Sequence, residues 1–292
     1  MRAIAQGVGM GFSLSISKRV SVCASVSCLM LAHTAWADQG LNQAEQVKQE
    51  SDSPHHVTTN VGLYSDYLFR GLSLARGRGA IQGFVDYSHV SGLFLGLGAT
   101  NVHRDAINGN TLEIDLYGGY THAWFEDLVG TVGFLQFYYP DNEKVAGQSS
   151  NVTELNFALD YHHLNFKLSY SLTDWFGANT KSVGNTQYGS HTTGTGDSKG
   201  STYTELNYNK PLPFAGLNLY LHVGHTAIKN YSVASYSDYA IGLTKDFSIA
   251  DSHGWNAGLS YVMTDTNDHW YVSSEGYKFG DNKFFGYVKR TF

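Results

Sequence analysis

From His55 onward, apolar and polar residues alternate with a period of two, and the alternation continues to the C terminus. Side chains of a β-strand point alternately to its two faces, so this pattern indicates strands with one apolar and one polar face. The first run begins at Val57 and reaches Arg70. Eleven further runs follow, at 79 to 89, 92 to 102, 111 to 123, 128 to 139, 152 to 162, 165 to 175, 202 to 210, 216 to 228, 236 to 248, 254 to 265 and 282 to 292. The sequence therefore predicts twelve strands, an even number.

The connections between these runs alternate between short and long. Short ones lie at 89–92, 124–127, 162–164, 211–215 and 250–253, whereas the longest are 177–200 and 266–281. Outer-membrane barrels have tight periplasmic turns and longer outer loops, and their tilted strands need about ten residues to cross the bilayer. We therefore expect an all-β fold: a transmembrane antiparallel up-and-down β-barrel of about 12 strands over residues 56–292. A soluble periplasmic β-sandwich or β-helix is the alternative, but no second buried face or covered edge is evident.

The residues before the barrel have the pattern of an export signal. Arg2, Lys18 and Arg19 precede a short apolar stretch, and Ala35-Trp36-Ala37 has the small-x-small pattern of a cleavage site. We expect residues 1–37 to be a signal peptide cleaved after Ala37, and residues 38–55 to be a flexible periplasmic segment. Both cysteines, at positions 23 and 28, fall within the signal, so the mature chain has no disulfide to stabilise it.

Charge and composition narrow the possible partners. Removing residues 1–37 takes away three basic and no acidic residues, which leaves 16 basic against 25 acidic residues and a net charge of −9. Such a surface does not suit nucleic acid. The 20 Tyr, 16 Phe and 32 Gly suit many strands whose two faces meet different surroundings. One domain, embedded in outer-membrane lipids, is the simplest organisation; the sequence leaves its oligomeric state open.

The parity of each strand separates lipid-facing from inward-facing residues. In the run 216 to 228, Leu217, Leu219, Leu221 and Val223 alternate with Asn218, Tyr220 and His222. Burying unpaired polar groups in hydrocarbon is costly, so the polar face must point inward. The same rule, applied to every strand, predicts these pore-lining residues: Asp66, Arg70, Asp86, Glu113, Asp115, Glu154, Asp160, Lys167, Glu205, His222, Asp238, Asp246 and Lys289.

Nine carboxylates against three basic groups make the predicted lumen acidic. Acidic rings favour cations in a pore, so we expect a channel with a weak preference for cations. Twelve strands imply a narrow or partly occluded pore, and the loop 177–200 is the segment we expect to fold inward. The alternative is that the carboxylates pair with the basic groups, Tyr and Asn to fill a plugged interior.

Aromatic residues near the predicted strand ends suit girdles at the two membrane interfaces. Some of them could instead line a slide for sugars or nucleosides. The predicted girdle comprises Tyr64, Tyr67, Phe69, Trp124, Phe125, Tyr138, Tyr139, Trp175, Phe176, Trp255, Trp270 and Tyr271.

Signals for catalysis or metal binding are weak. Ser190-His191 lie in a long loop and His222 and His225 on a strand, and no G-x-S-x-G elbow is present. The adjacent pairs His55-His56 and His162-His163 point to opposite faces of a strand. We therefore predict no enzymatic activity, no cofactor and no metal site.

The last strand ends on an aromatic residue. Phe284, Val288 and Phe292 share one face, while Phe285, Tyr287, Lys289 and Thr291 share the other. Arg290 falls on the apolar face and is expected to reach the headgroups at the periplasmic rim. This ending resembles the closing strand of outer-membrane barrels, in which a terminal Phe is read by the barrel-assembly machinery; Phe292 is thus the predicted assembly signal.

Several stretches resemble the TorF family of Gram-negative porins from about Val57 to Phe292. They are Asn60-Val-Gly-Leu-Tyr-Ser-Asp-Tyr-Leu-Phe-Arg-Gly71, Gln82-Gly-Phe-Val-Asp-Tyr87, Glu113-Ile-Asp-Leu-Tyr-Gly-Gly-Tyr120 and Tyr236-Ser-Asp-Tyr-Ala-Ile-Gly-Leu243. The resemblance implies a bacterial outer-membrane porin. We expect passive diffusion of small hydrophilic solutes, and the alternative is a non-conducting structural or adhesion barrel that acts through its outer loops.

Overall fold

A computed structural model describes residues 53–125, 127–182 and 194–292. The predicted signal peptide, 1–37, and nearly all of the predicted leader, 38–55, lie outside these residues. No helix within the described ranges is long and apolar enough to span a membrane.

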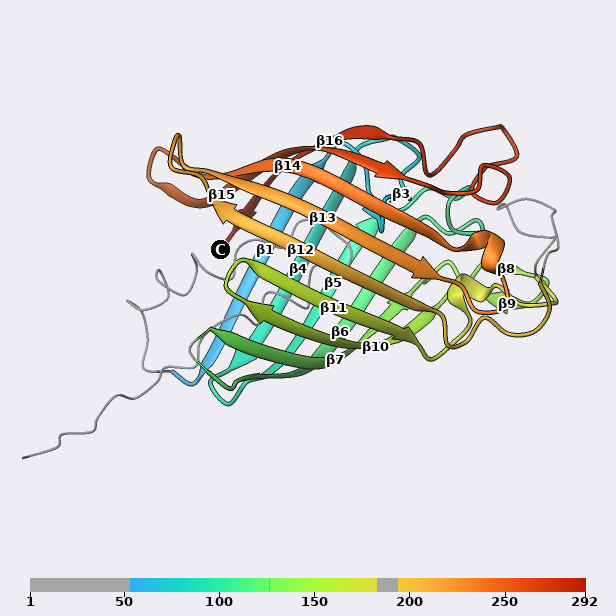
Figure 1. Cartoon of the computed structure of the whole chain (residues 1–292), viewed down its shortest axis with the longest axis horizontal. Helices are drawn as coiled ribbons and strands as arrows, with labels where there is room; N and C mark the ends of the chain where they lie inside the picture. Colours follow the sequence, from blue (N-terminus) through green and yellow to red (C-terminus); the bar gives the residue numbers. More distant parts are fainter. Residues whose placement is uncertain (1–52, 126, 183–193) are drawn as a thin grey trace, which may run out of the picture.

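Twelve antiparallel strands form a closed barrel, which confirms the predicted fold class (Figure 1). Each strand pairs with the next in the wall, and β1 pairs with both β4 and β16 to close it. The wall strands are β1 (His55–Tyr64), β4 (Ala80–His89), β5 (Leu93–Asn101), β6 (Leu112–Ala123), β7 (Leu128–Tyr138), β10 (Val152–Tyr161), β11 (Leu164–Ser171), β12 (Thr202–Pro211), β13 (Leu217–Ala227), β14 (Tyr236–Ile249), β15 (Ser252–Thr264) and β16 (Lys283–Thr291). Short elements in the connections are the hairpin strands β2 (Leu68–Phe69) and β3 (Leu72–Ser73), the strands β8 (Lys144–Val145) and β9 (Gln148–Ser149), and the 3₁₀ helices η3 (Trp175–Gly177) and η4 (Ser232–Ala234).

The connections at the two ends of the barrel differ in length. One end, the short-turn end, has connections such as 90–92 and 250–251, and the C terminus lies there (Figure 1). The other, the long-loop end, has connections such as 172–201 and 265–282. The predicted alternation of loop lengths is therefore present.

The outer face of the barrel is apolar. Leu93, Leu95 and Leu97 on β5 are about half exposed, whereas Phe94 between them is only 4% exposed. Comparable exposed Val, Leu, Ile and Phe side chains occur on the other wall strands. A surface of this kind suits contact with lipid tails, and the closed wall leaves no unpaired edge, so the soluble-sandwich alternative is wrong.

Inside the wall, aromatic rings lie against glycines of neighbouring strands. Phe84 is directly opposite Gly98, and Tyr287 is directly opposite Gly258. A Cβ atom at either glycine would collide with the facing ring. The glycines thus let large rings pack close to the backbone, which explains why so many glycines occupy inward positions.

The last strand has the predicted orientation. Phe284 and Phe292 point outward, at 73% and 60% exposed, while Phe285, Tyr287 and Lys289 are buried inside the barrel. Arg290 is on the outer side, where its guanidinium lies 4.2 Å from the centroid of the Phe292 ring and 5.6 Å from that of Trp255.

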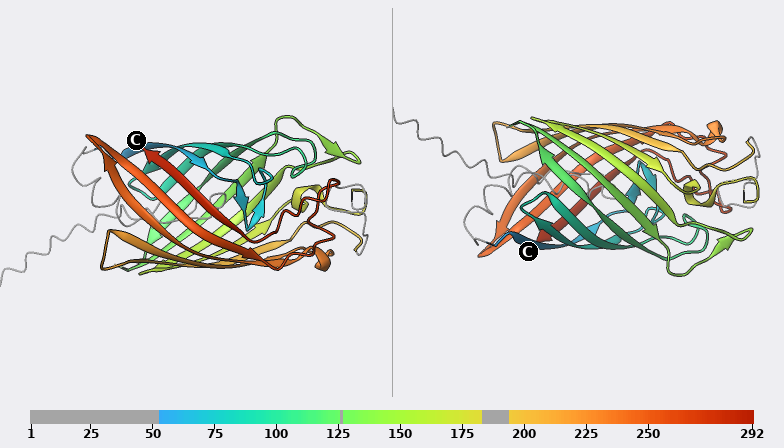
Figure 2. Two further views of the ribbon diagram at one scale, coloured as in Figure 1. Left: turned by 90° about the horizontal axis from the view of Figure 1, so that it is seen from above. Right: turned by 90° about the horizontal axis from the view of Figure 1, so that it is seen from below.

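The first strand is shorter than the period-two pattern predicted. It ends at Tyr64, and residues 65–79, here named the inner segment, turn into the barrel (Figure 2). Within this segment β2 and β3 form a hairpin in which Phe69 pairs with Leu72. Its two turn residues, Arg70 and Gly71, have φ values of 49° and 80°. Positive φ at both positions is the requirement of a tight two-residue hairpin turn.

Candidate functional site

The inner segment crosses the lumen at the long-loop end. Tyr67 donates a hydrogen bond to Glu113 on β6, and Arg70 pairs with Glu154 on β10. On the other side of the barrel, a Cβ at Gly71 would lie 2.8 Å from the Cβ of Asp238 on β14 and 2.6 Å from Cγ2 of Thr264 on β15. Since these strands lie on opposite sides of the closed wall, the segment reaches from one side to the other.

Apolar side chains of the inner segment pack against an apolar part of the wall. The Phe69 ring meets those of Phe137 and Phe176 edge-on, with centroids 5.5 and 5.4 Å apart. Leu135, Phe137 and Tyr139, the apolar set of the predicted strand 128 to 139, are all buried inside the barrel. These side chains therefore point inward, where the hairpin packs against them, while Val132 and Phe134 of β7 face outward.

The girdle prediction was wrong for most of its aromatic residues. Trp124, Phe125 and Tyr138 are exposed on the outside, at 45% or more, and Trp255 is half-buried. The remaining eight are buried: Tyr64, Tyr67, Phe69, Tyr139, Trp175, Phe176, Trp270 and Tyr271. Most of these rings pack around the inner segment and the connections at the long-loop end. Sequence periodicity alone could not distinguish such buried rings from rings at a membrane interface.

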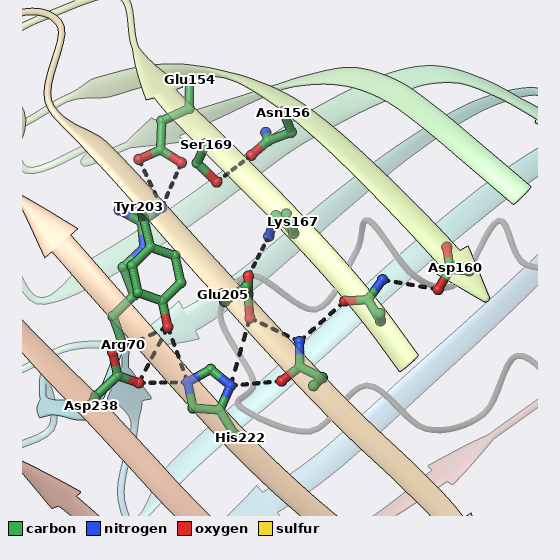
Figure 3. Close-up of polar contacts among 12 residues, drawn as sticks. Arg70, Glu154, Asn156, Asp160, Lys167, Ser169, Tyr203, Glu205, His222 and Asp238 are labelled. Atoms are coloured by element: carbon green, nitrogen blue, oxygen red, sulfur yellow. Dashed lines mark hydrogen bonds and ion pairs between the residues drawn. The ribbon is translucent and has the colours of Figure 1, made fainter. Parts of the chain in front are cut away.

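One side of the lumen carries charged groups on five consecutive strands, β10 to β14 (Figure 3). We name this set the charged wall; it consists of Glu154, Lys167, Glu205, His222 and Asp238. Arg70 Nη2 donates to both carboxylate oxygens of Glu154, at 2.8 and 2.7 Å. The same guanidinium lies 4.3 Å from the centroid of the Tyr203 ring on β12. Arg70 thus joins the tip of the hairpin to two strands of the charged wall.

The contacts continue along the charged wall without a break. His222 Nε2 lies 2.7 Å from Asp238 and 3.1 Å from the Tyr203 hydroxyl, while its Nδ1 lies 2.6 Å from Asn207 Oδ1. Glu205 accepts a hydrogen bond of 3.1 Å from Asn207 and lies 3.3 Å from the Lys167 ammonium. These groups are fixed by one another, so the wall presents a rigid pattern of charges.

Carboxylates on β4 and β6 have neutral hydrogen-bond donors. Glu113 accepts from Tyr67 of the inner segment and from Tyr139 after β7, and Asp86 accepts from Tyr117. Glu113 and Asp115 are completely buried. Glu113 therefore serves to hold the inner segment through Tyr67.

The thirteen residues predicted to line the lumen divide into two groups. Eleven are on wall strands, at positions that share parity with buried neighbours. The other two, Asp66 and Arg70, are not on the first strand, as the pattern predicted, but on the inner segment. Towards the short-turn end, Asp160 accepts from Asn165 and the exposed Asp246 accepts from Asn256.

Sequence reasoning missed several residues of this site. Lys283 of β16 lies 3.7 Å from Asp66 and adds a fourth basic group to the interior. Tyr203 and Asn207 share the parity of Glu205 on β12, so the same rule could have found them. The sequence pattern places Tyr67 in the membrane girdle as part of the first run, but the chain leaves the wall after Tyr64 and Tyr67 is buried in the lumen.

The rim of the barrel holds the base of the inner segment. Arg76 pairs with Asp105, at 2.7 Å, and with Glu275. We name these three residues the rim clamp. The Arg76 hydrogen bond lowers the pKa of the Glu275 carboxyl. Nearby, Ser73 N–H donates to the Phe279 carbonyl at 2.9 Å.

The loop 177–200, predicted to fold inward, is described only in part. Residues 183–193, which include Ser190 and His191, lie outside the described residues. Phe176, the residue directly before this loop, contacts Phe69 of the inner segment. The segment that crosses the lumen in the described part of the chain is thus 65–79, and the loop after β11 packs against it.

No cluster of three or more His, Cys, Asp or Glu side chains suited to a metal occurs among the described residues. Both ring nitrogens of His222 contact Asp238, Tyr203 or Asn207. Acid, amide and phenol groups surround the basic groups Arg70, Lys167 and Lys283 in the interior.

Comparisons with known proteins give a family and a fold. A family model described as "Bacterial protein of unknown function (Gcw_chp)" matches residues 48–292. The chain resembles the solved structure of KdgM porin at 7% sequence identity and a TM-score of 0.45, over 80% of this chain and 99% of that chain. It resembles NanC porin at 10% identity and a TM-score of 0.46, again over 80% of this chain and 99% of that chain. It also resembles the outer membrane protein OprD from Pseudomonas aeruginosa at 13% identity and a TM-score of 0.38, over 81% of this chain and 65% of that chain. No curated protein matches the sequence.

Proposed function

This chain belongs to the Gcw_chp family of bacterial proteins of unknown function, and we propose that it is an outer-membrane channel for passive diffusion of small hydrophilic solutes. One observation carries the proposal: a closed barrel with an apolar exterior has an interior lined with charged and polar side chains. A barrel that only displayed its loops would not need such a lining along the strands. The TorF resemblance of the stretch from Asn60 to Gly71 supports the same function.

In this proposal the inner segment controls the width of the path. It crosses the lumen next to the charged wall, and Arg70 neutralises Glu154 at its tip. Solutes pass only when the hairpin shifts from its seat, so the channel conducts weakly and intermittently. Lumen carboxylates that hydrogen-bond to neutral partners, such as Asp160 with Asn165 and Asp246 with Asn256, give the path a weak preference for cations.

We further propose the route by which the protein reaches the membrane. Residues 1–37 direct export and are cleaved after Ala37, and the rest of the predicted segment 38–55 remains as a periplasmic leader up to His55, where β1 begins. The barrel-assembly machinery then inserts the barrel among outer-membrane lipids, with Phe292 as the recognised terminus. The short-turn end would face the periplasm and the long-loop end the outside.

Single-channel recording of the refolded protein in planar bilayers tests the function. Wild-type protein should give small, brief openings, and replacement of Leu68–Leu74 by a Gly/Ser linker of equal length should give larger and longer ones. In a salt gradient the reversal potential of the linker variant should show cation preference, which Asp246→Asn should reduce. Asp251→Asn, in the exposed turn between β14 and β15, is the matched control.

A second candidate function has a specific observation in its favour. The inner segment is held by a buried ion pair and by the Tyr67 hydrogen bond to Glu113, which would suit a permanently closed barrel that acts through its outer loops. Closed traces at all voltages from both the wild type and the linker variant, each shown to be folded by heat-modifiable gel mobility, would favour this candidate. A reversal potential that shows anion preference in the linker variant would instead exclude the cation selectivity proposed for the channel.

A further inference from the structure

Two histidines face each other on the outside of the barrel at the short-turn end. His55 on β1 is directly opposite His89 on β4 in the antiparallel register. Both residues share the parity of outward-facing neighbours, since Val57 and Val85 are 64% and 50% exposed. The two imidazole ring centroids are 5.1 Å apart. The fold thus brings together two side chains that are 34 positions apart in the sequence.

This ring separation matches the geometry of two imidazoles on one tetrahedral metal ion. A metal–nitrogen bond of about 2.1 Å places each ring centroid roughly 3.2 Å from the ion. Two such rings have centroids about 5 Å apart at a tetrahedral angle and about 4.5 Å apart at the right angle of a tetragonal Cu²⁺ site, so the spacing is close to both. The observed spacing therefore needs little movement to admit an ion between the rings.

Each ring also has a hydrogen-bond partner on the nitrogen nearer the backbone. His55 Nδ1 lies 2.8 Å from the Tyr87 hydroxyl, and His89 Nδ1 lies 2.7 Å from the Ser91 hydroxyl. Ligating histidines characteristically donate their second ring N–H to such a partner, which directs the lone pair of the other nitrogen to the metal. The Ser91 backbone N–H donates to the same His89 nitrogen at 3.2 Å, so binding a metal through Nε2 requires the other tautomer, in which Nδ1 carries the proton and donates to the closer Ser91 hydroxyl.

We propose that the Nε2 atoms of His55 and His89 together bind one late first-row divalent metal ion, with water completing its coordination. Imidazole ligands suit Cu²⁺, Ni²⁺ and Zn²⁺, and among these Cu²⁺ binds most tightly. The site lies on the outer wall, apart from the lumen, and does not depend on conduction. A bound ion would join the first residue of β1 to the last residue of β4.

Other histidines at this end of the barrel lack the same arrangement. His162 and His163 are adjacent in the sequence, and their rings pack on Tyr161 and Tyr208, respectively. His122 lies between Tyr120 and Trp124. His253 contacts Ser248 through Nδ1, at 2.8 Å, and has no histidine directly opposite it, because Phe247 and Ile249 pair with Trp255 and Ser252. His253 is therefore a suitable single-histidine control.

Copper binding to the refolded, tag-free protein tests the proposal. Electron paramagnetic resonance with one equivalent of Cu²⁺ should show coupling to two imidazole nitrogens in the wild type. Titration calorimetry should show a loss of affinity on the order of a hundredfold in His55→Gln and in His89→Gln, and none in His253→Gln. Ser91→Ala should weaken binding about tenfold, because the remaining backbone N–H favours the tautomer with its proton on Nε2.

Two results would overturn the site. One is a wild-type spectrum with a single coupled nitrogen, a measurement that needs no variant to fold. The other is equal Cu²⁺ affinity in His55→Gln, His89→Gln and His253→Gln. Unchanged affinity in Ser91→Ala would remove the role given to its hydroxyl.

Discussion

Arg70 is the residue at which the hairpin turn and the charged wall meet. Its backbone adopts a positive φ of 49°, which a residue with a Cβ tolerates only when its surroundings hold it there. The surroundings here are the bidentate contact with Glu154 and the Tyr203 ring. Gly71 follows with φ 80° and leaves no room for a side chain against Asp238 and Thr264. These two residues seat the hairpin in the lumen.

Gly71→Ala should therefore displace the hairpin. Left-handed backbone costs an alanine roughly 1 kcal/mol, and the clash with the wall should add about 1–3 kcal/mol. Gly276→Ala is the matched control, since Gly276 has φ 82° and nothing within 4 Å of an added Cβ. We expect Gly71→Ala to lower the free energy of unfolding in urea by clearly more than the control does, and to increase the open time of the channel. Equal stabilities would show that the hairpin does not occupy the described position in solution.

At the scale of elements, the inner segment is held at both ends by different forces. Its tip is buried and depends on an ion pair and aromatic packing, whereas its base depends on the rim clamp at the surface. Exposed ion pairs are weak and respond to salt and pH. The clamp is thus the more easily altered of the two attachments, and the base of the segment should loosen before its tip.

Acid should release the base of the inner segment. Arg76 lowers the pKa of Glu275 in the folded protein below the ordinary value of 4.5. The contact therefore stabilises fully above that ordinary value and is lost as pH falls through the lowered one. Hydrogen exchange at Leu74–Gly77, corrected for intrinsic rates, should quicken in acid in the wild type. It should be fast and less sensitive to acid in Glu275→Gln, whereas Glu143→Gln in another loop should behave as the wild type. Acid sensitivity that persists in Glu275→Gln would assign the effect to other groups.

At the scale of the whole molecule, β16 completes the barrel. The residue after it, Phe292, exchanges two backbone hydrogen bonds with Thr59 of β1: Phe292 N–H donates to the Thr59 carbonyl at 2.8 Å, and Thr59 N–H donates to the Phe292 carbonyl at 3.3 Å. The Phe292 side chain makes no contribution to the interior, because it points outward against Arg290. Its contribution to the folded barrel is therefore small compared with that of the inward rings of the same strand.

Deleting Phe292 should consequently impair assembly in cells more than it affects the folded protein. We expect a marked fall in the amount of heat-modifiable barrel in outer-membrane fractions, with unchanged conductance of the same variant refolded in vitro. Phe284→Ala, which removes another exposed ring from the opposite end of β16, should assemble normally. Normal insertion of the truncated chain would end the role proposed for the terminal residue.

The wall follows from the sequence alone: twelve strands, most of their bounds within a few residues, the alternation of short and long connections, and the inward parity of residues such as Glu205, His222 and Lys289. Strand periodicity is a local property of the sequence. In a membrane barrel every strand has one face towards lipid and one towards the lumen, so the same alternation recurs in each strand. What fills the lumen depends on contacts between distant segments. Residues 65–70 continue the alternating pattern of the first strand, yet they turn inward, where Phe69 packs on Phe137 and Phe176 and Arg70 pairs with Glu154. The pairing of His55 with His89 is likewise a matter of register between strands, which no single run of residues contains.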